Sequence, residues 1–162
     1  MLIGIISDSH DHISHVQKAV AVFKRQKVEL VLHAGDYCSP FIIPLFEALP
    51  LKGVFGNNDG DHYLLMRKFK EIGGELLGTF GDLEFDDLRI ALYHGTNAPI
   101  TKALEESGNF DVVISGHTHQ KRLERVGKTL ALNPGSSHGF GERATIALLE
   151  TSTQEAEVIP LS

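Results

Sequence analysis

Short apolar runs that end in polar residues alternate with helical patterns over the first 72 residues of the chain. An apolar run with polar ends predicts a buried strand, and apolar side chains three or four positions apart predict a helix. The pattern predicts strands at Leu2–Ser7, Leu30–His33 and Leu51–Phe55, and helices at 11–27, 39–49 and 61–72. This repeated order is typical of a largely parallel sheet with right-handed crossovers.

The second predicted helix carries its own start signal. Ser39 and Pro40 supply an N-cap and a first-turn proline, and Pro44 is expected to delay or kink the helix. We expect the apolar stripe Phe41–Leu49 to belong to the core.

Beyond residue 72 the strand-like runs lie closer together. Runs at 75–79, 82–86 and 88–93 are expected to form adjacent strands, with a turn at Asp86-Asp87. The rest of the pattern predicts a helix near 98–107 and strands at 111–115, 121–126, 128–132, 144–150 and 155–160. We therefore predict an α/β fold, a two-sheet β-sandwich flanked by helices, with residues 1–162 as a single domain.

Composition narrows the class of protein. With 42% hydrophobic and 22% charged residues, the chain resembles an ordinary globular domain and not a disordered, collagenous or coiled-coil protein. The first apolar run stops at Ser7, too early for a membrane span or a signal-peptide core. Cys38 is the single cysteine, so we expect a reducing compartment, the cytoplasm. The net charge of −6 disfavours a nucleic-acid partner held by phosphate–lysine contacts.

Polar clusters follow five of the predicted strands, at the strand ends where ligands bind in open α/β sheets. They are Ser7-Asp8-Ser9-His10, His33-Ala34-Gly35-Asp36, Gly56-Asn57-Asn58-Asp59, His94-Gly95 and Gly116-His117-Thr118-His119. Taken singly, most of them are more typical of a loop or turn than of a site. Five together favour a metal site, because histidine and carboxylate are metal ligands.

The series D-x-H, G-D, G-N-x-D, H-G and G-H-T-H resembles the calcineurin-like metallophosphoesterases. The chain length and Asn133-Pro134-Gly135-Ser136 resemble their small bacterial and archaeal phosphodiesterases. The resemblance implies the αββα fold of that family and hydrolysis of a small phosphodiester by a hydroxide that bridges two divalent metal ions. It assigns Asp8, His10 and His119 to one ion, Asn57, His94 and His117 to the other, and Asp36 to both.

The inferred donors include no thiolate, so they suit Mn²⁺ first, with Ni²⁺, Fe²⁺, Zn²⁺ and Co²⁺ as alternatives. Two divalent ions outweigh the charges of Asp8, Asp36 and a hydroxide, so the site attracts a phosphate even on an acidic chain. Arg143, in a glycine-rich loop, is a weaker candidate for a bidentate phosphate contact.

One position departs from the family pattern. Many members have a histidine, regarded as the proton donor to the leaving group, where this chain has Asn58. We expect Asn58 to serve catalysis through its amide, which can bond a phosphoryl oxygen but carries no titratable proton. Activated aryl diesters should then react better than alkyl diesters. His12, His62 and His138 are alternative donors, each more typical of a surface or structural histidine.

The roles of two neighbouring residues stay open at this point. His33 is expected to be a core residue or a support for the ligands, and Asp59 to orient its loop or cap the following helix.

Relatives often form dimers or larger assemblies, so a homo-oligomer is compatible with the resemblance.

Two other functions remain in view. Retromer subunits use the same fold in trafficking complexes, so a non-catalytic metal-binding scaffold is one alternative. The seven filled ligand positions favour an enzyme, whereas Asn58 keeps the scaffold open. The other alternative is a nuclease like the double-strand-break repair members, which a short acidic chain without a basic stripe disfavours.

Overall fold

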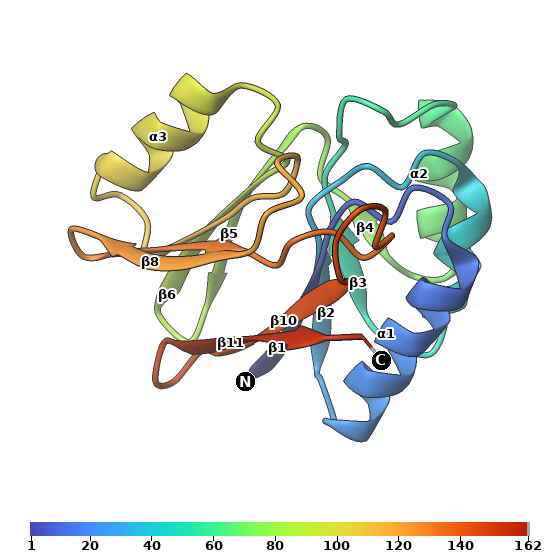
Figure 1. Cartoon of the computed structure of the whole chain (residues 1–162), viewed down its shortest axis with the longest axis horizontal. Helices are drawn as coiled ribbons and strands as arrows, with labels where there is room; N and C mark the ends of the chain where they lie inside the picture. Colours follow the sequence, from blue (N-terminus) through green and yellow to red (C-terminus); the bar gives the residue numbers. More distant parts are fainter. Residues whose placement is uncertain (162) are drawn as a thin grey trace.

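The computed structural model describes residues 1–161, which form two β-sheets packed face to face (Figure 1). Sheet A has the strand order β11-β10-β1-β2-β3-β4, and sheet B has the order β5-β6-β7-β9-β8. The strands of sheet A are β1 (Leu2–Ile6), β2 (Leu30–His33), β3 (Leu51–Gly53), β4 (Glu75–Leu76), β10 (Thr145–Glu150) and β11 (Glu155–Pro160). The strands of sheet B are β5 (Phe80–Phe85), β6 (Leu88–Tyr93), β7 (Val112–Ile114), β8 (Arg122–Val126) and β9 (Thr129–Asn133).

Helices cover the outer faces of both sheets. The 3₁₀ helix η1 (Pro40–Phe46) and the α-helices α1 (Ile13–Arg25) and α2 (His62–Glu71) pack on sheet A, while α3 (Ala98–Glu106) lies over sheet B (Figure 1). The predicted two-sheet sandwich flanked by helices is confirmed.

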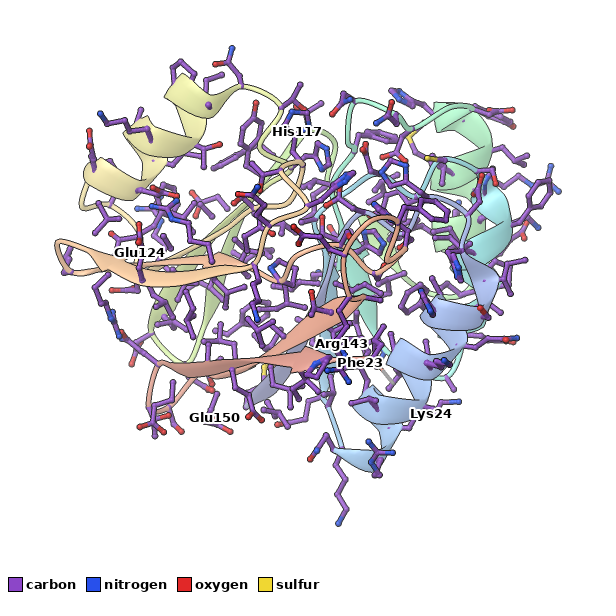
Figure 2. The ribbon with its side chains drawn as sticks, in the orientation of Figure 1. Phe23, Lys24, His117, Glu124, Arg143 and Glu150 are labelled. Atoms are coloured by element: carbon purple, nitrogen blue, oxygen red, sulfur yellow. The ribbon has the colours of Figure 1, made fainter. Side chains whose placement is uncertain are left out.

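The hydrophobic core follows these layers. One cluster of buried side chains fills the space between the two sheets, a second lies between sheet A and its helices, and a small third lies under α3. Phe23 of α1, labelled in Figure 2, is fully buried. A Cβ on Gly4 of β1 would lie 2.7 Å from its ring. Helix α1 therefore approaches the sheet closely because Gly4 has no side chain.

Parallel strands bring the polar clusters to one edge of the molecule. In sheet A, β1, β2 and β3 are parallel, with Ile6 beside His33 and His33 beside Gly53. In sheet B, β6, β7 and β9 are also parallel. The loops that follow these strands therefore leave the two sheets at their carboxyl ends, where they can meet.

Three expectations about the elements were wrong in part. The run at 75–79 does not join the next two strands, because β4 pairs in parallel with β3 and the chain crosses to sheet B before Phe80. The segment after Ser39 is a 3₁₀ helix, since Pro44 inside it has no N–H to donate to an α-helical bond. The stripe Phe41–Leu49 belongs to the core except at Phe41, which is 74% exposed, whereas Ile42, Ile43, Phe46 and Leu49 are buried. None of the helices within residues 1–161 has the length and apolar character that a membrane span needs.

Candidate metal centre

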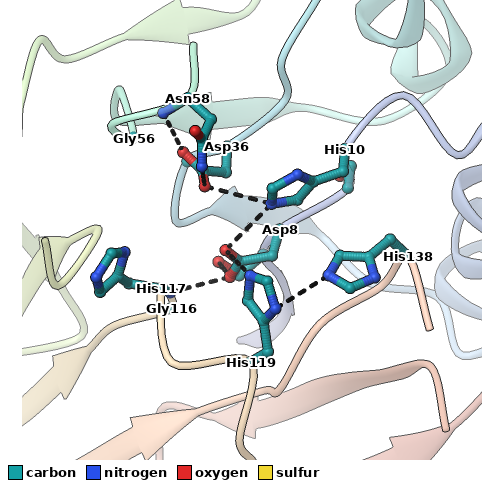
Figure 3. A network of polar contacts seen from close by, with 12 residues as sticks. Asp8, His10, Asp36, Gly56, Asn58, Gly116, His117, His119 and His138 are labelled. Atoms are coloured by element: carbon teal, nitrogen blue, oxygen red, sulfur yellow. Dashed lines mark hydrogen bonds and ion pairs between the residues drawn. The ribbon is translucent and has the colours of Figure 1, made fainter. Parts of the chain in front are cut away.

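The loops at this edge bring the predicted ligand residues into one cluster, most of which Figure 3 shows. Its members come from the segments after β1, β2, β3, β6 and β7, and they are Asp8, His10, Asp36, Asn57, His94, His117 and His119. Asp8, Asp36 and His94 are almost completely buried. The cluster lies at the end of the sandwich, with residues from the loops of both sheets.

One half of the cluster surrounds Asp8 and His10. The Nε2 atom of His10 lies 3.3 Å from Asp36 Oδ2 and 3.8 Å from Asp8 Oδ1, and His119 Nε2 lies 3.3 Å from Asp8 Oδ1. Asp8 Oδ1 and His10 Nε2 are buried, and neither has a hydrogen-bond partner among the described residues. Buried polar atoms are almost always paired. A cation between these two atoms would satisfy both, so the donor set fits a divalent metal ion.

The other half surrounds His94. Its Nδ1 atom donates to the carbonyl oxygen of Ala34 at 2.8 Å, which leaves the Nε2 lone pair free. That Nε2 atom lies 3.4 Å from Asp36 Oδ1 and 3.0 Å from Asn57 Oδ1, and the rings of His94 and His117 are 5.2 Å apart. A histidine held in this way by a backbone carbonyl is typical of metal ligands.

Asp36 lies between the two halves, with one carboxylate oxygen toward His10 and the other toward His94. Burial alone would raise its pKa, but His94 and two donors from Asn58 outweigh burial and hold the pKa of Asp36 well below its usual range. The same carboxylate raises the pKa of His94 despite the burial of that ring, and the Asp8 carboxylate raises the pKa of His10. The cluster therefore keeps its carboxylates ionised and attracts positive charge.

Two residues beside the cluster hold these loops in place. Asp59 accepts backbone N–H bonds from Gly56 at 2.6 Å, Cys38 at 2.9 Å and Asp36 at 3.1 Å. It therefore orients the loops, while Asp61 caps α2. His33 is fully buried beneath the cluster and bonds Ser9 Oγ at 2.6 Å, and burial lowers its pKa to about 3.

Most of the predicted ligands have an unusual backbone. Positive φ angles occur at Asp8 (52°), His10 (40°), Asp36 (59°), His117 (66°) and His119 (61°). Residues other than glycine rarely adopt this region, and they cluster in it at functional sites. Bonds between loops hold the conformation, among them Asp8 N to Gly35 O at 3.0 Å and His10 N to Asp36 O at 3.1 Å.

The side chain of Asn58 turns inward. Its Nδ2 donates to Asp36 Oδ2 at 2.8 Å, and its backbone N–H donates to Asp36 Oδ1 at 2.8 Å (Figure 3). The amide that was expected to meet a phosphoryl oxygen instead holds the carboxylate at the middle of the cluster.

His138 is a member of the cluster that sequence reasoning set aside. It is 2% exposed, and its ring centroid lies 4.8 Å from that of His10 and 4.6 Å from that of His119. Its Nδ1 accepts the N–H of Phe140 at 2.7 Å, so the proton of the neutral ring lies on Nε2, 3.2 Å from His119 Nδ1. Burial and the nearby histidines lower its pKa to about 4. A usable signal existed, because the segment after β9, another parallel strand, also leads to this edge.

The two other alternative proton donors have structural contacts. His12 caps α1 by accepting the backbone N–H of His15 at 3.3 Å, and the ring of His62 stacks on Phe55 at 3.9 Å.

Comparison with known proteins agrees with this geometry. The calcineurin-like phosphoesterase superfamily domain matches residues 1–154. The phosphodiesterase MJ0936 of Methanocaldococcus jannaschii is 39% identical over 165 residues, 99% of each chain. A solved archaeal phosphodiesterase superposes with a TM-score of 0.94 at 38% identity, over 99% of this chain and 100% of the other. Zinc-bound Vps29 from Entamoeba histolytica shares the fold, with a TM-score of 0.72 at 18% identity over the full length of both chains. The chain belongs to the calcineurin-like phosphoesterase superfamily.

Proposed function

We propose that this chain is a phosphodiesterase that uses two divalent metal ions and acts on a small phosphodiester. The observation that carries the proposal is the pair of buried, unpartnered atoms Asp8 Oδ1 and His10 Nε2 within a cluster of carboxylates and imidazoles. The similarity to a phosphodiesterase over nearly the whole chain supports the same reaction.

The residues divide into two sets around a shared carboxylate. Asp8, His10 and His119 would hold one ion, and Asn57, His94 and His117 would hold the other. Asp36 would contact both, since its two oxygens face different histidines. Two such ions would supply positive charge toward the phosphoryl oxygens and an activated water as nucleophile.

Asn58 has a positioning role in this proposal. Its side-chain and backbone donors hold both oxygens of Asp36, which keeps that carboxylate ionised and correctly oriented. Asn58 carries no titratable proton, and the lowered pKa of His138 keeps its ring neutral. The leaving group therefore departs with little protonation by the protein. Substrates with acidic leaving groups, such as aryl diesters, should therefore react best.

The preferred metal is Mn²⁺, with Ni²⁺, Fe²⁺, Zn²⁺ and Co²⁺ as alternatives, because the proposed ligands are nitrogen and oxygen atoms.

The single cysteine supports a cytoplasmic location. One domain across residues 1–162 is consistent with a family match that spans most of the chain. A homo-oligomer stays a prediction that sedimentation analysis would test.

The direct test is hydrolysis of bis(4-nitrophenyl) phosphate by metal-stripped protein, with Mn²⁺, Ni²⁺, Zn²⁺ or Mg²⁺ added back separately. Asp36→Asn should abolish turnover. Asp87→Asn is a matched control, since Asp87 is an exposed aspartate with a similar positive φ of 64°. It should retain full turnover.

The same experiment separates the enzyme from the scaffold. Absence of turnover with every ion, while two metal ions bind per chain, would refute the phosphodiesterase and favour a metal-binding scaffold. That alternative has support in Vps29, which shares this fold and binds zinc in its solved structure.

A further inference from the structure

A small cavity adjoins the candidate metal centre on the side of His119. Its volume is about 200 Å³, and His119 forms one wall. Val158 and Pro160 of the edge strand β11 also line it, and Lys121, Glu142 and Arg143 lie around them. Whole small-molecule sites usually occupy about 300–1,000 Å³, so this space suits one chemical group of a larger ligand.

Two cations line the cavity, and neither is paired with an acidic side chain among the described residues. Among residues 1–161, neither Lys121 nor Arg143 forms a salt bridge or a side-chain hydrogen bond, and both are exposed. The neighbouring Arg122 differs, because Glu105 and Glu124 neutralise it. Glu142 also lines the cavity and provides one negative charge against two positive ones.

The two cations come from separate segments of the chain. Lys121 follows the His117–His119 segment and precedes β8, whereas Arg143 precedes β10 and is labelled in Figure 2. The fold therefore brings an arginine and a lysine together beside a metal ligand, on a chain with a net charge of −6. Arginine binds phosphate through two parallel N–H bonds, and lysine adds a point charge.

We propose that this cavity is a subsite for a second phosphate group on the substrate. The inference rests on the proposed phosphodiesterase and specifies its substrate class, a small phosphodiester with a phosphate monoester on one of its ester groups. The scissile phosphate lies at the metal centre, and the second phosphate reaches past His119 to Lys121 and Arg143. Glu142 weakens this contact, so it limits the affinity for the second phosphate.

The test uses two matched substrates, the 4-nitrophenyl ester of thymidine 5′-phosphate with a 3′-hydroxyl or with a 3′-phosphate. The Mn²⁺-loaded protein should have a higher kcat/KM for the 3′-phosphorylated ester. Arg143→Ala and Lys121→Ala should each lower the ratio of the two kcat/KM values by about tenfold, chiefly through KM. Glu142→Gln should raise the ratio, and added salt should reduce it, since the cations are exposed.

Lys128→Ala is the matched control. Lys128 is an exposed lysine in the turn between β8 and β9, and it does not line the cavity. It should leave the ratio unchanged. A wild-type ratio near one would overturn the subsite, and so would a ratio that survives both Arg143→Ala and Lys121→Ala.

Direct binding separates this inference from the proposed reaction. If neither ester is hydrolysed, the phosphodiesterase proposal fails, and calorimetric titration of the Mn²⁺-loaded protein still tests the subsite. Thymidine 3′,5′-bisphosphate should then bind about tenfold more tightly than thymidine 5′-phosphate, and Arg143→Ala should remove the difference. Equal binding of the two nucleotides would overturn the subsite.

Discussion

Replacing Gly56 with alanine should damage the metal centre although it replaces none of the proposed ligands. Gly56 packs directly against Asp36, the carboxylate between the two halves of the cluster. A Cβ at position 56 would lie 2.5 Å from Asp36 N and 2.9 Å from Asp36 Cγ, and closer still to Oδ1. Ordinary non-bonded contacts between heavy atoms begin at about 3.5 Å, so the two loops would have to separate by roughly 1 Å.

Two effects of this separation can be given magnitudes. Forcing an extra carbon into a packed site costs about 1–3 kcal/mol of folding free energy. Misplacing a catalytic group by about 1 Å costs roughly a hundredfold in rate. The loop cannot relax freely, because the N–H of Gly56 is bonded to Asp59 at 2.6 Å. We therefore expect Gly56→Ala to fold with a lower Tm, to bind Mn²⁺ weakly and to lose about two orders of magnitude in kcat/KM.

Three measurements check this expectation: calorimetric titration with Mn²⁺, thermal unfolding, and hydrolysis of bis(4-nitrophenyl) phosphate. Gly60→Ala is the control in the same loop, since a Cβ there would meet only the carbonyl oxygen of Cys38, at 3.3 Å. It should bind and hydrolyse almost as the wild type does. Wild-type metal affinity and turnover in Gly56→Ala would show that the contact with Asp36 does not position the carboxylate.

Three further expectations follow from the contacts of the centre and its surroundings. Asn58→Ala removes a donor 2.8 Å from the central carboxylate, so metal affinity, measured against a competing chelator, should fall about tenfold; an unchanged value would contradict the positioning role. The carboxylates raise the pKa of His10, and of His94 despite its burial, so apparent metal affinity should fall as the pH drops from about 8 to about 6. Glu105→Ala breaks a buried carboxylate's bonds to Arg122 at 2.6 and 3.1 Å and should cost roughly 1–3 kcal/mol in urea unfolding, because Arg122 is partly exposed and keeps a second partner.

Most of the features that the sequence predicts correctly come from local patterns of apolar and polar residues. The strands β1, β2 and β11 lie within one residue of their predicted positions, because their apolar runs have clear polar ends. The ordered series of polar clusters identified the family, which the comparison with known proteins confirmed. The assignment of individual ligands stays a prediction, although the structure brings those residues together.

Long-range contacts account for what the sequence could not predict. Strand β4 joins sheet A only because Leu76 lies beside Gly53, a pairing that no local pattern encodes. The inward turn of Asn58 depends on the position of Asp36, 22 residues away in sequence. His138 enters the cluster because backbone N–H groups of Ser137 and His138 bond the carbonyls after β1. In each case the deciding partner is distant along the chain.

The loops hold the proposed ligands in strained backbone conformations even before a metal ion binds. Each unfavourable backbone angle costs on the order of 1–3 kcal/mol, and five of the seven proposed ligands have one. The bonds of Asp8 and His10 to the loop after β2, together with the three N–H groups held by Asp59, offset this strain in the folded chain. The ligand geometry is therefore imposed by the loops and the two sheets that carry them. A metal ion would meet side chains already oriented toward it, so its binding free energy would go into holding the ion and not into ordering the loops.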